Sequence, residues 1–148
     1  MSERQALGQR GEQLAVDFLK KKGYQILTRN WRAGHWGEID IVTRDYSCRS
    51  KIFNQFWPAS PSLGGPIFLF NKELTPLVFV EVKTKTNHNF GLPEEELTVA
   101  KQRKLRRAIQ QWLWQHKITG NNWRLDLVAI DWPSDGAQPE IRHYEGLQ

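Results

Sequence analysis

Charged residues interrupt a segment that otherwise has the composition of a buried strand. In LVFVEVKTKT, residues 77–86, the apolar run is broken by Glu81 and Lys83. Alternation along a strand places both residues on the same face as Phe79 and the valines on the opposite face. We therefore expect one face of this strand to carry a carboxylate and an ammonium group together.

A second carboxylate belongs to the earlier strand-like segment GEIDIVT. Alternation directs Asp40 to one face and its neighbours Ile39 and Ile41 to the other. If this segment pairs with the first one, Asp40 and Glu81 can lie side by side. Two such carboxylates repel each other unless a cation lies between them, and either Lys83 or a bound metal ion could be that cation.

These residue types suit metal-assisted hydrolysis of a phosphodiester. Mg²⁺ prefers oxygen ligands, commonly takes one or two carboxylates and keeps several waters, and Mn²⁺ could substitute for it. A metal held by Asp40 and Glu81 could polarise the phosphodiester and lower the pKa of a bound water. Lys83 could hold that water or offset charge on the phosphoryl group.

Each candidate residue also has an ordinary structural explanation. An acid and a base two positions apart on a strand often form a solvated ion pair worth about 0–1 kcal/mol. Asp40 could be a solvent contact at a strand end, and Glu12 a charge flanking the apolar stripe of a helix. Gln102 could bond to the backbone at the edge of the core. Asp126 could pair with Arg124.

Two helices and five strands must position the candidate residues. The sequence patterns predict helices at 5–22 and 98–117 and strands at 24–31, 37–44, 77–86, 123–131 and 140–145. Gly23 should end the first helix, and Thr98 should cap the second. The first two strands, separated by RAGHWG, are expected to form a hairpin. This order indicates an α/β sandwich in which helices flank a small mixed sheet.

The second helix combines an apolar stripe with basic residues. The stripe consists of Leu105, Ala108, Ile109, Trp112 and Leu113. Helical geometry directs Gln102 into this stripe. The basic residues either point away from the stripe or lie at its borders, and the run KQRKLRR could be an ordinary solvated helix face. Those expected to contact nucleic acid are Lys101, Arg103, Lys104 and Arg107.

The composition narrows the class of protein. A chain of 148 residues suggests one domain, and a net charge of +5 favours anionic partners such as nucleic acid or acidic lipid. Cys48 is the single cysteine, and the four histidines lack the spacing of zinc ligands, so disulfides and thiolate or zinc centres are not expected. The sequence has neither a signal-peptide pattern nor a long apolar run, so we expect a cytoplasmic protein without a membrane span.

The motifs taken together resemble a known family. The segments GQRGEQLA, GEIDIV, VFVEVKTKT, LPEEELTVAKQRKLRRA and RLDLVAI are similar, in this order, to those of the YraN-like family of uncharacterised bacterial proteins. That family resembles the archaeal Holliday junction resolvases of the PD-(D/E)xK nuclease superfamily. The resemblance implies a restriction-endonuclease-like α/β fold and a Mg²⁺-dependent endonuclease acting on DNA, including branched DNA.

The resemblance also implies roles for individual residues. Asp40 would be the metal-binding acid, and Glu81 and Lys83 would be the acid and base of the ExK motif. Val82 would add its backbone carbonyl to the metal shell. Glu12 matches an acid on the first helix that contacts the metal directly or through water.

One further match and two departures complete the comparison with that family. Gln102 matches a helix glutamine near the active site. Ile39 stands where the superfamily has a proline. An insertion at 45–76, between the second and third strands, replaces a short turn. Its aromatic residues could fill space beneath the sheet, form a subunit contact or stack on unpaired bases; they are Phe53, Phe56, Trp57, Phe68 and Phe70.

Three functions remain open on the sequence alone. The first is the metal-dependent endonuclease, for which a homodimer is expected because a junction resolvase must cut two strands at related positions. The second is a nucleic-acid-binding module that keeps the fold with little or no catalysis. The third is an interaction protein whose working surface is the insertion.

Overall fold

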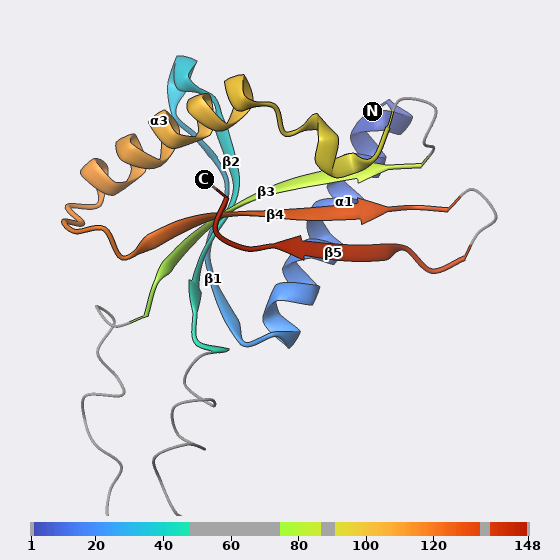
Figure 1. Cartoon of the computed structure of the whole chain (residues 1–148), viewed down its shortest axis with the longest axis horizontal. Helices are drawn as coiled ribbons and strands as arrows, with labels where there is room; N and C mark the ends of the chain where they lie inside the picture. Colours follow the sequence, from blue (N-terminus) through green and yellow to red (C-terminus); the bar gives the residue numbers. More distant parts are fainter. Residues whose placement is uncertain (1, 48–74, 87–90, 134–136, 148) are drawn as a thin grey trace, which may run out of the picture.

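The computed structural model describes residues 2–47, 75–86, 91–133 and 137–147. The five aromatic residues expected to matter in the insertion lie outside the described residues. The elements in chain order are α1 (Glu3–Lys21), β1 (Tyr24–Arg32), η1 (Gly34–Trp36), β2 (Glu38–Asp45), β3 (Leu77–Lys85), η4 (Pro93–Glu96), α3 (Val99–Gln115), β4 (Trp123–Asp131) and β5 (Glu140–Tyr144). Figure 1 shows this arrangement.

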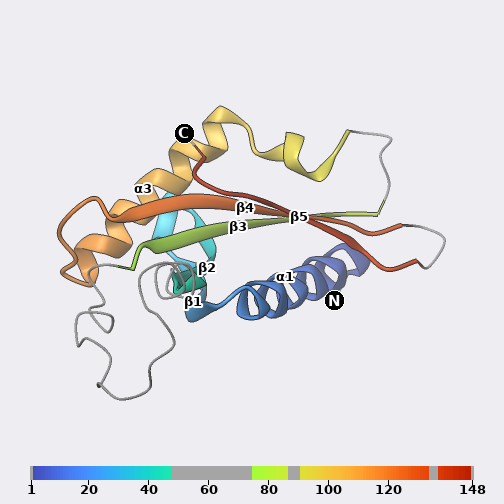
Figure 2. The same ribbon diagram turned by 60° about the horizontal axis from the view of Figure 1, so that its bottom comes forward.

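The sheet contains five strands in the order β1-β2-β3-β4-β5. β3 and β4 run parallel, and the other neighbouring strands run antiparallel. Figure 2 shows α1 on one face of the sheet and α3 with η4 on the other. The expected mixed α/β sandwich and the hairpin of the first two strands are confirmed. Within the described ranges, no helix is long and apolar enough to cross a membrane.

Helix α1 begins with a capping box and lies directly on β3. Ser2 Oγ accepts a hydrogen bond from Gln5 N at 3.3 Å, and the Gln5 side chain accepts one from Ser2 N at 2.9 Å. Gly11 is buried against Thr84, and a Cβ at position 11 would lie 1.9 Å from Thr84 Oγ1. The glycine therefore permits a close approach of helix and sheet, which brings the next residue, Glu12, to the end of β3.

Helix α3 packs its predicted apolar stripe against the opposite face. Thr98 caps the helix by accepting a hydrogen bond from Lys101 N at 3.2 Å. The buried residues of the helix are the five expected ones, Leu105, Ala108, Ile109, Trp112 and Leu113. Burial of this stripe fixes the rotation of α3 and so decides which side chains of its first turn approach the sheet.

The strand faces agree with the predicted alternation in β3 but not throughout β2. Phe79 packs in the core on the α3 side, whereas Val78 and Val80 pack on the α1 side. Ile39 and Ile41 were expected on one face, yet Ile39 packs on the α3 side and Ile41 on the α1 side. The β2–β3 ladder starts at the latter residue, so the preceding part of β2 lacks that restraint and can twist towards α3.

Candidate active site

The site is formed where β2 and β3 separate. The last pair of their ladder is Ile41 with Val80, so Asp40 and Glu81 are the next residues on the two strands. Asp40 Oδ2 accepts a hydrogen bond from the backbone N–H of Val82 at 2.7 Å. A side chain thus continues the link between the strands beyond their main-chain pairing. The expected proximity of the two carboxylates is confirmed.

An open cleft of about 280 Å³ surrounds this junction. The charged residues Arg4, Glu38 and Glu96 line part of it. Five further charged residues that line it were singled out from the sequence: Glu12 of α1, Asp40 of β2, Glu81 and Lys83 of β3, and Lys101 of α3. Four of these residues are the acids and the base that the sequence indicated as catalytic. The fifth, Lys101, was expected on a nucleic-acid-binding surface and instead reaches the same cleft.

Glu81 is the most constrained carboxylate of the cleft. It is 2% exposed, and its Oε1 lies 2.8 Å from Lys83 Nζ and 3.4 Å from Lys101 Nζ. Its Oε2 is buried and has no hydrogen-bond partner among the described residues. Leaving a buried carboxylate oxygen unpaired is costly, so such an atom calls for a ligand.

Asp40 is strongly affected by this environment. Burial raises the pKa of its carboxyl to about 7, and the charges of Glu81 and Glu12 act in the same direction. The hydrogen bond from Val82 and the charge of Lys83 oppose this shift without cancelling it. A cation bound between the carboxylates would favour the ionised form of Asp40.

Lys83 remains a cation in the cleft. Burial acts to lower the pKa of its ammonium group, but the charge and hydrogen bond of Glu81, with a smaller contribution from Asp40, raise it overall. The ammonium is therefore charged when it approaches Glu81. Lys83 therefore forms an ion pair with Glu81, while its part as the cation between the two carboxylates stays a prediction.

The donor set fits a hard, largely hydrated cation better than zinc. Among the described residues, no group of three or more His, Cys, Asp or Glu side chains is arranged to hold a metal ion. Two carboxylates with open space for water and a phosphate oxygen match the coordination preferences of Mg²⁺. They do not match the closed nitrogen or sulfur shell of structural zinc. Glu12 borders the cleft without completing such a group, and a carbonyl contribution from Val82 stays a prediction.

Gln102 forms the hydrogen bond to the backbone that was expected if its role is structural. It is half-buried, and its Nε2 donates to the carbonyl of Leu97 at 3.4 Å. It does not line the cleft, whereas the preceding residue, Lys101, does. A part for Gln102 in catalysis stays a prediction, and its observed contact fixes the connection between η4 and α3.

Three of the remaining basic residues of α3 are directed away from the sheet, as predicted. Arg103, Lys104 and Arg107 are exposed. Arg106 is half-buried and donates to the carbonyl of Leu147 at 2.6 Å. The exposed cations are thus available at the surface beside the cleft, while Arg106 fastens the chain near its C-terminal end.

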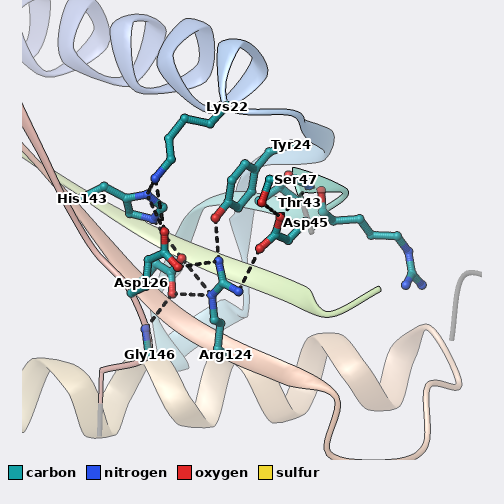
Figure 3. A network of polar contacts seen from close by, with 11 residues as sticks. Lys22, Tyr24, Thr43, Asp45, Ser47, Arg124, Asp126, His143 and Gly146 are labelled. Atoms are coloured by element: carbon teal, nitrogen blue, oxygen red, sulfur yellow. Dashed lines mark hydrogen bonds and ion pairs between the residues drawn. The ribbon is translucent and has the colours of Figure 1, made fainter. Parts of the chain in front are cut away.

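A second polar cluster, shown in Figure 3, lies near the other end of α1 and β2. Asp126 is fully buried and accepts hydrogen bonds from Arg124 Nε at 3.1 Å and from Gly146 N at 2.9 Å, and His143 Nε2 lies 2.9 Å from its other oxygen. Arg124 also pairs with Asp45 at 2.9 Å.

The predicted pair of Asp126 with Arg124 is therefore confirmed, while the contribution of His143 was not foreseen. The sequence predicted both strands but not their register, and it is the β4–β5 pairing, with His143 opposite Val128, that brings His143 close to Asp126. The carboxylate oxygens of Asp126 are all engaged by protein groups. This cluster is therefore a structural tie, in contrast to the unsatisfied oxygen of Glu81.

Another hollow, larger than the cleft at Asp40 and Glu81, is also a weaker candidate. It has a volume of about 470 Å³ and is lined by residues 117–120 and 122–123, among others, with no carboxylate. It also adjoins Thr75, where a described range begins. Chemistry therefore favours the smaller cleft at Asp40 and Glu81.

Fold and cleft define a class: a small α/β sandwich with an acidic pair and two lysines where its central strands separate. Residues 11–130 match the model of the uncharacterised protein family UPF0102. The chain belongs to this family, which is the YraN-like family that its motifs resemble. The matched range includes every cleft residue discussed above.

Relatives from distant bacteria match over most of their length. A UPF0102 protein of Mycolicibacterium gilvum is 35% identical over 144 residues, covering 97% of this chain and 94% of the relative. One from Geotalea daltonii is 37% identical, covering 96% and 88%. One from Chloroherpeton thalassium is 36% identical, covering 88% and 78%.

Proposed function

We propose that the protein is a Mg²⁺-dependent endonuclease that hydrolyses phosphodiester bonds in DNA. The observation that supports this most directly is the buried, unpartnered Oε2 of Glu81 beside Asp40 in an open cleft. A divalent cation would satisfy that oxygen and relieve the repulsion between the two acids. An all-apolar or fully paired site would need no such ligand.

The residues of the cleft have distinct parts in this proposal. Asp40 and Glu81 would hold the metal, with Val82 and Glu12 contributing through a carbonyl and through water. When bound, the metal would polarise the phosphoryl group and lower the pKa of a coordinated water. Asp40 is oriented for this by the Val82 N–H, which engages Oδ2 and leaves Oδ1 out of that bond.

The two lysines would act on the substrate. Both approach Glu81 Oε1, so their positive charges converge at one edge of the cleft. Lys83 would orient the attacking water or stabilise the charge that develops on the phosphoryl oxygens. Lys101, whose side chain is 40% exposed, would bind the neighbouring phosphate.

The surface next to the cleft supports a nucleic acid as the substrate. α3 carries five basic residues and no acidic residue between positions 99 and 115. Three of the basic side chains, Arg103, Lys104 and Arg107, are exposed. Cations spaced along a helix can contact successive phosphates, which positions the strand without reading its sequence.

A binding module without catalysis is the second candidate, and one observation favours it. Lys83 and Lys101 both approach the same oxygen of Glu81, so the carboxylate is partly neutralised without a metal. In that case DNA binding would depend on salt and not on Mg²⁺. The third candidate, an interaction protein, depends on the insertion at 45–76, of which residues 48–74 lie outside the described residues.

Calorimetric titration with Mg²⁺ and Mn²⁺ separates the first two functions. The nuclease proposal predicts metal binding in the wild type and its loss in Asp40→Asn, with cleavage of a four-way junction or linear duplex in the wild type alone. Lys83→Ala should keep metal and DNA binding but lose cleavage. Asp17→Asn, a change at an exposed carboxylate of α1 outside the cleft, is the matched control and should behave as wild type.

Two results would decide against this proposal. Unchanged cleavage in both Asp40→Asn and Lys83→Ala would exclude the cleft as the catalytic site. Salt-dependent DNA binding by the wild type without metal binding or cleavage would support the binding module instead.

A further inference from the structure

The turn between β1 and β2 presents an aromatic side chain at a well-defined tip. Trp36 N donates to the carbonyl of Ala33 at 3.1 Å, and Ala33 N donates to that of Gly37 at 2.9 Å. Gly34 and Gly37 have φ values of +57° and +118°, which glycine adopts without strain. The turn is therefore closed by main-chain bonds, although Trp36 at its tip is 38% exposed.

The surroundings of Trp36 differ from those of the core tryptophans. Trp112 packs its ring against Phe79, with the centroids 5.4 Å apart. Trp36 instead has the ring of His35 at 4.2 Å and the guanidinium carbon of Arg107 at 5.4 Å from its ring centroid. An exposed indole next to a cation has the two groups that hold a nucleic acid base and its phosphate.

The tip is close to the candidate active site. Trp36 at the end of η1 is four residues before Asp40 of β2, so their Cα atoms are at most about 13 Å apart. Figure 1 shows the tip beside α3, the helix that also supplies Lys101 to the cleft. A nucleotide stacked on Trp36 would therefore be near a phosphate bound in the cleft along the same strand.

We propose that Trp36, supported by Arg107, is a stacking platform for an unpaired base of the DNA substrate. This inference rests on the proposed nuclease function and adds a residue that would select among DNA substrates. Bases inside a continuous duplex have their faces covered by their neighbours, so the platform selects DNA with a splayed or unpaired base next to the scissile phosphate. Branched and gapped DNA have such bases, whereas an uninterrupted duplex does not.

The experiment measures binding without cleavage, with EDTA present. Fluorescent 2-aminopurine is placed at the unpaired position of a gapped duplex, and an uninterrupted duplex of the same length is compared. Trp36→Ala should weaken gapped-DNA binding roughly tenfold and abolish quenching of the 2-aminopurine, with duplex affinity unchanged. Trp36→Phe should retain most of the affinity and quenching.

Two further variants separate stacking from other effects. Trp36→Leu keeps apolar bulk at the tip but cannot stack, so it should behave like Trp36→Ala, and thermal melting checks that each variant is folded. Trp114→Ala is the matched control, because Trp114 is 75% exposed on α3 but about 20 Å along the helix from Lys101. It should leave gapped-DNA binding unchanged.

The outcomes distinguish this inference from the nuclease proposal. Equal losses for gapped and uninterrupted DNA in folded Trp36→Ala, or full affinity and quenching in Trp36→Leu, would overturn the stacking platform. Wild-type quenching that Trp36→Ala abolishes, combined with absence of cleavage in Mg²⁺, would support the platform and reject the nuclease. Cleavage in Mg²⁺, combined with an unchanged preference of Trp36→Ala for gapped over uninterrupted DNA, would support the nuclease and reject the platform.

Discussion

Lys101 Nζ lies 3.4 Å from Glu81 Oε1, so the first turn of α3 reaches across the cleft to the central strand β3. The contact depends on the cap at Thr98 and on the buried stripe of α3, which together set the position and rotation of the helix. A cation in this position competes with a metal for Glu81 and at the same time attracts a phosphate. These two effects can be separated by mutation.

Lys101→Gln should therefore strengthen Mg²⁺ binding while it weakens DNA binding. Loss of an ion pair that is partly exposed changes the free energy by up to about 1 kcal/mol, which corresponds to about a fivefold change in either affinity. Calorimetry measures the metal affinity, and fluorescence anisotropy measures DNA binding in EDTA. Lys104→Gln, at an exposed position of the same helix, should weaken DNA binding without affecting the metal. Metal affinities that change equally in both variants would contradict the role of Lys101.

The raised pKa of Asp40 predicts how the stability of the metal-free protein depends on pH. Its pKa rises from 3.8 to about 7 on folding because of burial and then the charge of Glu81. Between these values the folded protein binds more protons than the unfolded chain, so the contribution of Asp40 to stability is complete below about pH 4 and is lost as pH rises to about 7. The free energy of unfolding should fall over this window by an amount on the order of a few kcal/mol.

The measurement is urea unfolding in EDTA at several pH values. Asp40→Asn cannot ionise but can still accept the hydrogen bond from Val82, so it should lack this part of the pH dependence. The difference between wild type and variant isolates Asp40 from the other carboxyl groups. Parallel stability curves from pH 4 to 7 would show that Asp40 does not titrate in this way.

The contact between α1 and β3 predicts that replacing two glycines of α1 by alanine has opposite effects on the stability of the protein. Gly11→Ala would place a Cβ 1.9 Å from Thr84 Oγ1, whereas a Cβ at Gly8 would meet no atom within 4 Å. Gly11→Ala should cost about 1–3 kcal/mol of stability through overpacking, and Gly8→Ala should add about 0.5–1 kcal/mol through helix propensity. Urea unfolding measures both.

The double variant Gly11→Ala/Thr84→Ala provides the control for this clash. Removing Thr84 Oγ1 should recover part of the stability, although Thr84 Cβ would remain about 3.0 Å from the new methyl group. Equal effects of alanine at positions 8 and 11 would exclude a close approach of α1 to β3.

Local patterns were sufficient to predict most of the fold. The period of the stripe on α3 and the alternation in β3 arise from backbone geometry, so Ile109, Phe79 and their neighbours point as predicted. The proximity of Asp40 and Glu81 was predicted on the condition that their two strands pair, and the β2–β3 ladder meets that condition. Ile39 was placed wrongly because twist at the end of β2 depends on where the ladder with β3 stops.

The parts of the site that sequence could not supply are contacts between elements. Lys101 was assigned to the surface because it lies at the border of the apolar stripe, and the tilt of α3 relative to β3 decides that it reaches Glu81. Gln102 was expected to face inward, and the structure shows it half-buried with the carbonyl of Leu97 as its partner. The family resemblance could indicate which residue types occupy these positions. It could not indicate which of the neighbours Lys101 and Gln102 enters the cleft.

The buried tie at Asp126 predicts a large loss of stability that is independent of the cleft. Asp126→Ala would leave Arg124, His143 and the backbone N–H of Gly146 without their shared acceptor. Removing one partner of a buried ion pair costs about 3–5 kcal/mol. Arg124 keeps its contacts with Asp45, Glu145 and the hydroxyl of Tyr24, which place the expected loss near the lower limit.

Urea unfolding of Asp126→Ala tests the tie, with Arg32→Ala as the control. Arg32 also forms an ion pair on the sheet, at 3.6 Å from Glu38, but its side chain is 80% exposed, so its removal should change the stability by less than about 1 kcal/mol. Mg²⁺ affinity of folded Asp126→Ala should equal that of the wild type, because Asp45, which pairs with Arg124, is about 17 Å from Asp40 along an extended β2. A loss below 1 kcal/mol would mean that water or Asp45 replaces Asp126 as the partner of Arg124. Loss of metal binding without unfolding would instead couple this cluster to the cleft.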